Sequence, residues 1–143
     1  MDPNHVRLTA AEATLGVRLP DRRLLRIALT DPGWCNEAET PLWVDPWPGN
    51  RRLAESGDAA LTDAGIATRD ARARRAEALG LWDHLWLAEG QRALQGAGRE
   101  TVLARAITAV VGAFALSQER GELPDDTEQQ ALIARIQGAT RPT

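Results

Sequence analysis

The segment that decides the fold is residues 101–117, which reads TVLARAITAVVGAFALS. One apolar stripe at helical spacing contains Leu103, Ile107, Val110 and Phe114. Smaller apolar residues widen that stripe on both sides: Val102, Ala106, Ala109 and Ala113. A helix that is apolar over so much of its surface has to be covered by protein, so this segment is predicted to be the central helix of the fold.

The rest of the chain is predicted to form shorter helices around this one, because helical spacing and cap residues recur and alternating β-branched runs are absent. The first helix is expected from Thr9, which has capping-box spacing, to Leu15, with Gly16 as its stop. Further helices are expected over residues 21–29, 50–64, 68–79 and 125–137, and a short one from Asp83 that turns Leu85 and Trp86 inward. The sequence therefore predicts a single all-α domain over residues 1–143.

The composition is that of an ordinary globular domain and restricts the kinds of partner. Of the 143 residues, 43% are hydrophobic and 26% are charged; the net charge is −3 and the pI is about 5.4. Proteins that bind nucleic acid through bulk charge carry a basic excess, so only a local basic patch could bind it here. All 17 basic residues are Arg, which contacts phosphate in a bidentate way better than Lys does.

Cysteine use and hydropathy bear on the cellular location. The single Cys35 excludes an internal disulfide and fits a reducing compartment. No signal peptide or membrane-spanning segment is expected from the sequence. The expected location is therefore the cytoplasm, with no membrane partner.

Residues 31–49 differ from the rest of the chain and are predicted to form a long irregular segment. Four prolines interrupt the segment, and three tryptophans make it too apolar for a plain solvent-exposed loop. These residues are Pro32, Pro41, Pro46, Pro48, Trp34, Trp43 and Trp47. We expect the segment to pack as a lid over the helices, and a binding loop is the alternative interpretation.

Two segments are informative when they are taken together. Residues 50–59 read NRRLAESGDA, and residues 96–113 read GAGRETVLARAITAVVGA. They resemble the two signature helices of the ribonuclease III family, which read approximately NERLEFLGDA and LADAFEAVIGA. Other short stretches resemble the same family: residues 15–16, 24–30 and 78–81. The resemblance covers about residues 9–118 and implies an all-α, ribonuclease III endonuclease-like domain that is trimmed by about one helix before residue 79.

The resemblance also implies a site for Mg²⁺, which prefers oxygen ligands and activates water for phosphodiester hydrolysis. The family places four carboxylates on the two helices, at positions that correspond here to Ala54, Asp58, Arg105 and Thr108. Only Asp58 is retained, and Arg105 brings a permanent positive charge to the site. We therefore expect no catalytic residue, no metal and no cofactor, with Mg²⁺ at Asp58 if the site is active after all.

The same resemblance suggests how the altered site is held together and how the chain associates. Asp58 is expected to form a salt bridge with Arg105 between the two helices. Another family carboxylate falls on Arg51, and Glu55 stands where the family has an apolar residue that enters its dimer partner. A symmetric homodimer is still expected, although the charge of Glu55 weakens the usual anchor.

Arginines of the helix at residues 68–79 are candidates for RNA contact. Arg69, Arg72 and Arg75 could bind phosphates, and a solvated helix face paired with acidic neighbours is the simpler interpretation. Trp82 and Trp86 are expected in the core rather than as base-stacking platforms.

These features together predict a catalytically inactive, dimeric ribonuclease III-like protein that binds structured RNA or a ribosomal particle. No double-stranded-RNA-binding domain is expected after residue 143, in which respect the chain is similar to the mini-ribonuclease III members that process ribosomal RNA. An atypical Mg²⁺-dependent endoribonuclease for double-stranded RNA is one alternative, and a protein-interaction module without an RNA role is another. Likeness at the level of the fold does not decide among them.

Overall fold

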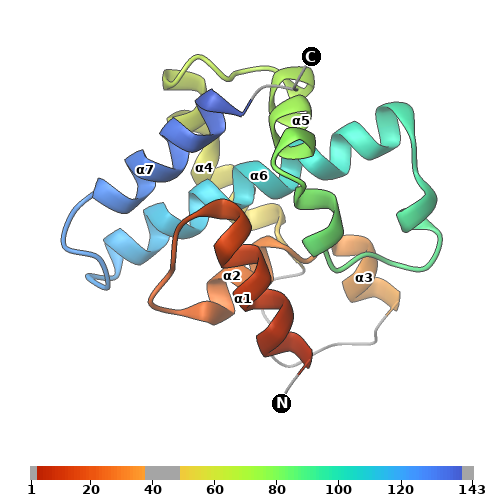
Figure 1. Ribbon diagram of the computed structural model, residues 1–143, viewed down its shortest axis with the longest axis horizontal. Coiled ribbons are helices and arrows are strands. Elements are labelled where there is room, and N and C mark those ends of the chain that lie inside the picture. Colours follow the sequence, from red (N-terminus) through yellow and green to blue (C-terminus); the bar gives the residue numbers. More distant parts are fainter. Residues whose placement is uncertain (1–2, 38–48, 140–143) are drawn as a thin grey trace.

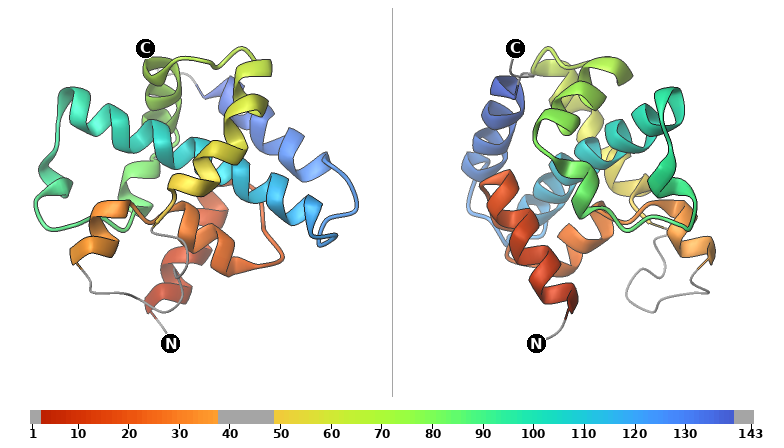
Figure 2. Two further views of the ribbon diagram at one scale, coloured as in Figure 1. Left: turned by 180° about the vertical axis from the view of Figure 1, so that it is seen from behind. Right: turned by 45° about the vertical axis from the view of Figure 1, so that its right-hand side comes forward.

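The computed structural model describes residues 3–37 and 49–139, and over these residues the protein is all-helical, as predicted. Its elements are α1 (Pro3–Leu15), α2 (Arg22–Ala28), α3 (Pro32–Glu37), α4 (Arg51–Asp63), α5 (Arg69–Ala78), the 3₁₀ helices η2 (Leu81–His84) and η3 (Gln91–Ala93), α6 (Gly96–Glu119) and α7 (Thr127–Gly138). Within this part of the chain the only β-type pairing is an isolated parallel bridge between Thr30 and Trp86. The other helices surround α6, which crosses the middle of the molecule (Figures 1 and 2).

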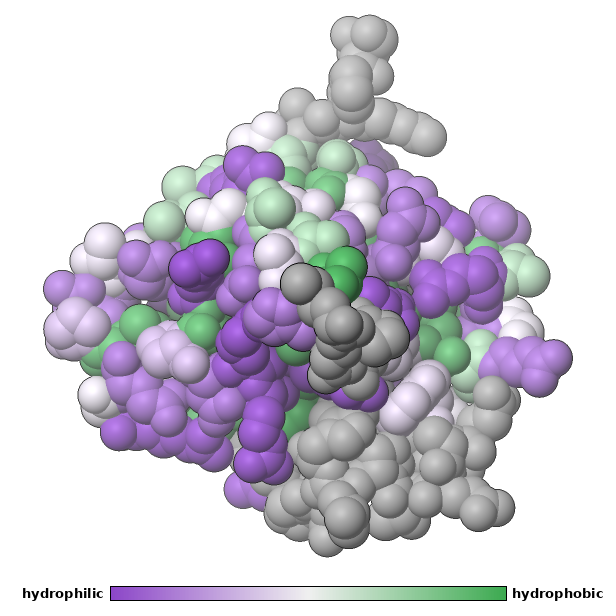
Figure 3. Space-filling model, turned by 60° about the horizontal axis from the view of Figure 1, so that its bottom comes forward, coloured by the Kyte–Doolittle hydropathy of each residue, from purple (hydrophilic) through white to green (hydrophobic). Residues whose placement is uncertain are grey.

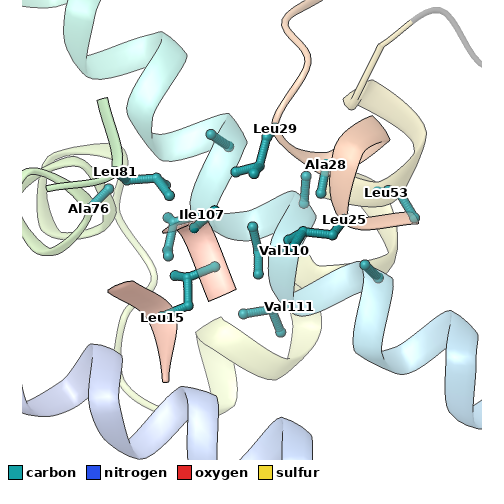
Figure 4. Close-up of a cluster of buried hydrophobic side chains, with 14 of the residues drawn as sticks. Leu15, Leu25, Ala28, Leu29, Leu53, Ala76, Leu81, Ile107, Val110 and Val111 are labelled. Atoms are coloured by element: carbon teal, nitrogen blue, oxygen red, sulfur yellow. The ribbon is translucent and has the colours of Figure 1, made fainter. Parts of the chain in front are cut away.

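The central position of α6 follows from its apolar residues. The predicted stripe from Leu103 to Phe114 is fully buried. Figure 4 shows side chains of α1, α2, α4 and α5 gathered around Ile107, Val110 and Val111. Among the described helices only α6 is long and apolar enough to cross a membrane, but 72% of that stretch is buried inside the protein. Core packing therefore accounts for its hydropathy.

α4 crosses α6 at very short range, and two glycines make this approach possible. A Cβ atom added to Gly57 would lie 2.0 Å from the carbonyl oxygen of Thr108, and one added to Gly112 would lie 1.8 Å from that of Leu53. No side chain fits at either position, because the atoms it would meet belong to the backbone of the other helix. The crossing fixes the relative placement of α4 and α6, the two helices that carry the candidate site.

Two helices begin earlier than predicted. α1 begins at Pro3, and the Thr9 hydroxyl does not cap a helix start but donates to the carbonyl oxygen of His5, one turn earlier. α6 begins at Gly96, so the glycine-rich stretch predicted as a loop forms its first turn. A capping box or a glycine involves only a few residues, and in both cases the residues before the predicted start also belong to the helix.

The helix ends at the other predicted positions are largely confirmed. The Asp21 carboxylate accepts a hydrogen bond from the Arg23 amide at the start of α2, and the Thr68 hydroxyl accepts one from the Ala71 amide at the start of α5. Gly80, just after α5, has φ +77°, the left-handed conformation expected of a glycine at a helix stop.

The region of the short helices differs from the prediction. η2 ends at His84 instead of beginning near it, and Trp86 lies in an extended stretch whose amide donates to the Leu29 carbonyl oxygen at 2.8 Å. The inward placement of Leu85 and Trp86 is confirmed. Part of the segment predicted to be irregular forms α3, whose Trp34 packs against the core. Residues 38–48, with Trp43 and Trp47, lie outside the described residues.

Candidate functional site

The four positions singled out by the resemblance lie on α4 and α6, the helices that cross through glycines. Ala54 and Asp58 lie on α4, and Arg105 and Thr108 lie on α6. Asp58 and Thr108 both contact a third helix, because each binds Arg72 of α5. The structure therefore brings a guanidinium group to the α4–α6 crossing.

Arg72 is buried, with a side chain only 9% exposed, and all of its N–H donors have acceptors. Its Nη1 lies 2.7 Å from Asp58 Oδ1 and 3.4 Å from Thr108 Oγ1. Its Nη2 donates to the Asp58 carbonyl oxygen at 3.2 Å and to Thr62 Oγ1 at 3.1 Å, and its Nε donates to the Ile66 carbonyl oxygen at 2.8 Å. This arrangement, called the Arg72 clamp below, joins α4, α5 and α6.

The predicted salt bridge between Asp58 and Arg105 is wrong. Arg105 Nη1 lies 3.4 Å from Asp31 Oδ1, and the Asp31 side chain is only 6% exposed. A buried carboxylate needs a counter-charge more than the exposed Asp58 does, and Arg105 supplies it. Asp31 also accepts hydrogen bonds from the Gly33 amide and from Gln91 Nε2, so its charge is held from three sides.

Arg69, Arg72 and Arg75 of α5, predicted as candidates for RNA contact, do not form one exposed surface. Arg72 is buried in its clamp and cannot reach a phosphate outside the protein. Arg75 donates from Nη1 to the carbonyl oxygens of Ile136 and Gln137 in α7, so it ties two helices together. Arg69 remains exposed, with a hydrogen bond of 3.4 Å to Thr101 Oγ1. The sequence could not show which arginines of this helix point inward.

The acidic neighbours on α5 do pair with arginines. Asp70 pairs with Arg74 at 2.7 Å, one turn further along the helix. Glu77 pairs with Arg99 of α6 at 2.6 Å, so its partner lies on another helix. The simpler interpretation was a solvated face of α5 on which arginines pair with acidic neighbours. It holds for Asp70, whose partner lies on the same helix, and not for Glu77.

The donors at the α4–α6 crossing do not fit a Mg²⁺ ion. Mg²⁺ needs several oxygen ligands in near-octahedral geometry, and this position offers one carboxylate, Asp58, whose Oδ1 is bonded to a guanidinium. Ala54 has no ligand atom, and the Thr108 hydroxyl donates to the Ala104 carbonyl oxygen at 2.6 Å. In the described part of the chain no group of three His, Cys, Asp or Glu residues is arranged for a metal.

The two tryptophans expected in the core are buried, Trp82 at 6% and Trp86 at 4% exposure, and arginines cover their rings. The Arg99 guanidinium lies 4.3 Å from the centre of the Trp82 ring, and that of Arg7 lies 4.0 Å from the Trp86 ring. Arg92 also faces Trp82. Sequence reasoning missed Arg7 and Arg92, which are far apart in the chain, and no local pattern could have joined them.

His84 lies beside this arginine cluster and bonds to Thr14 of α1, with 2.9 Å between Nε2 and Oγ1. Burial lowers the pKa of His84; the charge of Asp83 raises it, and that of Arg7 lowers it further. The neutral imidazole is thus the form that the fold favours.

Comparison with known proteins adds no relative: no family model, no curated protein and no solved structure matches this chain.

Proposed function

We propose that this protein is a catalytically inactive, ribonuclease III-like protein that binds structured RNA as a homodimeric scaffold. The observation that supports this most is the Arg72 clamp, in which a guanidinium lies 2.7 Å from Asp58 and 3.4 Å from Thr108. These are two of the four positions at which the resemblance implies metal ligands. A fixed cation takes the place that a catalytic cation would need.

Electrostatics supports the loss of catalysis. Two like unit charges about 4 Å apart repel by about 4 kcal/mol at the effective dielectric constant near a protein surface, and a divalent ion doubles that repulsion. Arg72 keeps its charge at any ordinary pH, so it does not yield to the metal by losing a proton. Ala54 and Arg105 supply no ligand oxygen that could offset the repulsion.

The RNA-binding part of the proposal rests on the resemblance over residues 9–118 and on exposed arginines such as Arg69. The surface gives little support to the alternative of a protein-interaction module. Val6 is the only exposed large hydrophobic residue among the described side chains. The coloured part of the face in Figure 3 is mostly hydrophilic, with hydrophobic residues in small separate patches. A structured RNA in the cytoplasm, free or in a ribosomal particle, is the partner that we propose.

The test is to incubate the purified chain with end-labelled double-stranded RNA and either Mg²⁺ or Mn²⁺, and to measure cleavage and retention on a filter in parallel. We expect no cleavage with either metal, and retention that weakens steeply as salt is raised. Sedimentation of the same sample should give a dimer. Cleavage that disappears in the variant Asp58→Ala would overturn the inactive assignment, and no retention even at low salt would overturn the RNA assignment.

A further inference from the structure

Two arginines from distant parts of the chain meet at one carbonyl oxygen. Nη2 of Arg7, in α1, donates to the Leu85 carbonyl oxygen at 2.8 Å. Nη2 of Arg92, in η3, donates to the same oxygen at 2.7 Å, and its Nη1 donates to the Trp82 carbonyl oxygen at 2.6 Å. Because both groups bind one oxygen, the two guanidinium charges lie side by side.

In the described part of the chain, the two charges have no acidic partner. Among the described residues, no carboxylate lies within ion-pair distance of Arg7 or Arg92. Arg99, the other arginine at Trp82, is paired with Glu77 and is therefore neutralised. A carbonyl oxygen carries only a partial negative charge, so it orients two guanidinium groups without compensating them. Two adjacent cations of this kind repel each other unless an anion lies between or above them.

The electrostatic environment of Arg7 agrees with the proximity of the two charges. Burial, with the positive charge of Arg92, lowers the pKa of Arg7. Burial is the main cause that lowers the pKa of His84; the charge of Asp83 raises that pKa, and the charge of Arg7 lowers it by less than Asp83 raises it. Arg7 therefore lies in the positive field of Arg92, although the whole chain has a net charge of −3.

The two arginines have donors to spare and are held in place. The contacts described use one of the five N–H donors of Arg7 and two of those of Arg92. The Arg7 guanidinium lies over the Trp86 ring, 4.0 Å from its centre, and this contact helps to hold it in place. Side chains that are already ordered lose less entropy when they bind a ligand.

We propose that Arg7 and Arg92 form a binding site for a phosphate group, supplied by the backbone of a bound RNA. Each guanidinium would donate to a different phosphate oxygen, the geometry at which Arg excels. The source of the phosphate rests on the proposed function, whereas the binding of phosphate by this pair does not.

The first experiment uses the unaltered chain and inorganic phosphate. The NMR signals of the Leu85 and Trp86 amides and of the Trp82 indole are followed during a phosphate titration, with chloride at equal ionic strength as the control. We expect saturable shifts with phosphate and none with chloride. An absence of shifts that are specific to phosphate would overturn the proposal, and this outcome does not depend on the folding of any variant.

The second experiment compares RNA binding by two double variants of equal net charge. Arg7→Gln with Arg92→Gln should weaken the binding of a short RNA duplex about tenfold and lower the slope of log affinity against log salt by about 1. The control, Arg18→Gln with Arg23→Gln, removes two exposed arginines elsewhere and should keep both values near those of the unaltered chain. Equal losses in the two variants would overturn the assignment to RNA phosphate.

The two experiments distinguish the present proposal from the proposed function. Specific shifts with inorganic phosphate but no binding of RNA would refute the RNA-binding function and identify a site for a free phosphate or a phosphorylated small molecule. Binding of RNA without phosphate-specific shifts at Leu85 and Trp86 would retain the function and reject this site.

Discussion

At the scale of single residues, Arg72 is the side chain that connects the three helices of the candidate site. Its side chain is 9% exposed, and it holds acceptors on α4, on α6 and in the turn before α5, while that of Asp58 is 64% exposed. The two halves of this ion pair therefore differ in their contribution to stability. Solvent can replace Arg72 as a partner of Asp58, but nothing else in the clamp can replace Arg72 as the donor to the Ile66 and Asp58 carbonyl oxygens.

The first prediction at this scale compares Arg72→Met with Asp58→Asn. Arg72→Met should lower the free energy of unfolding by about 2–3 kcal/mol, because it leaves buried acceptors without a donor. Asp58→Asn should lower it by only about 0.5 kcal/mol, because the carboxylate is largely exposed. Urea denaturation of both variants measures the difference. Equal losses would show that the ion pair itself, and not the satisfaction of the carbonyl groups, holds the three helices.

Part of the candidate site could be predicted from the sequence, but its central contact, between Arg72 and Asp58, could not. The positions of Ala54, Asp58, Arg105 and Thr108 could be found because they follow local patterns on two helices. The partner of Asp58 could not, since α5 carries several arginines and only its rotation against α6 turns Arg72 inward. Asp31 was missed as the partner of Arg105 for the same reason: the contact depends on how the turn after α2 packs on α6.

At the scale of elements, the crossing of α4 and α6 fixes the relative placement of the two helices that carry the candidate site. The pair of glycines at the crossing lets the two backbones approach until a methyl group at either position would overlap a carbonyl oxygen. The relevant atoms belong to rigid helices, so they cannot rotate out of the way as a side chain would. The crossing is thus a steric requirement of the fold and is independent of any catalytic role.

The second prediction tests this requirement with Gly57→Ala and Gly112→Ala. Each should lower the free energy of unfolding by about 3 kcal/mol, the upper part of the range for overpacked cores, because the helices have to move apart. The matched control is Gly138→Ala at the end of α7, where an added Cβ meets nothing within 4 Å. It should leave stability unchanged or raise it by up to about 1 kcal/mol, since Ala favours helix over Gly. Thermal unfolding of the three variants is the measurement, and a mild effect at Gly57 would contradict the close approach.

Most elements were predictable because their signals are local. The apolar stripe of α6 and the caps of α2 and α5 lie within a few residues of one another, and the helices formed there. The start of α1 was missed because its first turn carries no apolar stripe, although Asp2 followed by Pro3 is a sequence signal for a helix start. The extended stretch at Trp86 was missed because its backbone partners, Leu29 and Asp31, are distant in the sequence.

At the scale of the whole molecule, charge is distributed unevenly over an acidic chain. Arginines are used in three ways: as buried clamps such as Arg72, as counter-charges such as Arg105, and as donors without an ion-pair partner among the described residues, such as Arg7. The net charge of −3 does not distinguish these uses, because it contains no information about where the charges lie in the structure. The packing of α1 against η2, which no sequence pattern indicated, brings Arg7 close to His84.

The third prediction concerns the stability of the whole molecule as a function of pH. Burial, and to a smaller extent the charge of Arg7, lowers the pKa of His84 in the fold against the raising effect of Asp83, whereas in the unfolded chain its pKa is near 6.5. Between these two pKa values the unfolded state binds more protons than the folded state, so the free energy of unfolding decreases as pH falls through that window. The decrease begins near the unfolded pKa and levels off below the folded one.

His84→Gln isolates this effect, because Gln can keep a hydrogen bond to Thr14 but does not titrate. We expect the Tm of the unaltered chain to fall when pH is lowered from about 7.5 to about 5.5, and the Tm of His84→Gln to fall less over the same window. Carboxylates titrate mainly below this window, so they contribute little to the difference between the two proteins. An equal fall in both would mean that His84 is as easily protonated in the folded protein as in the unfolded chain, and that burial does not lower its pKa.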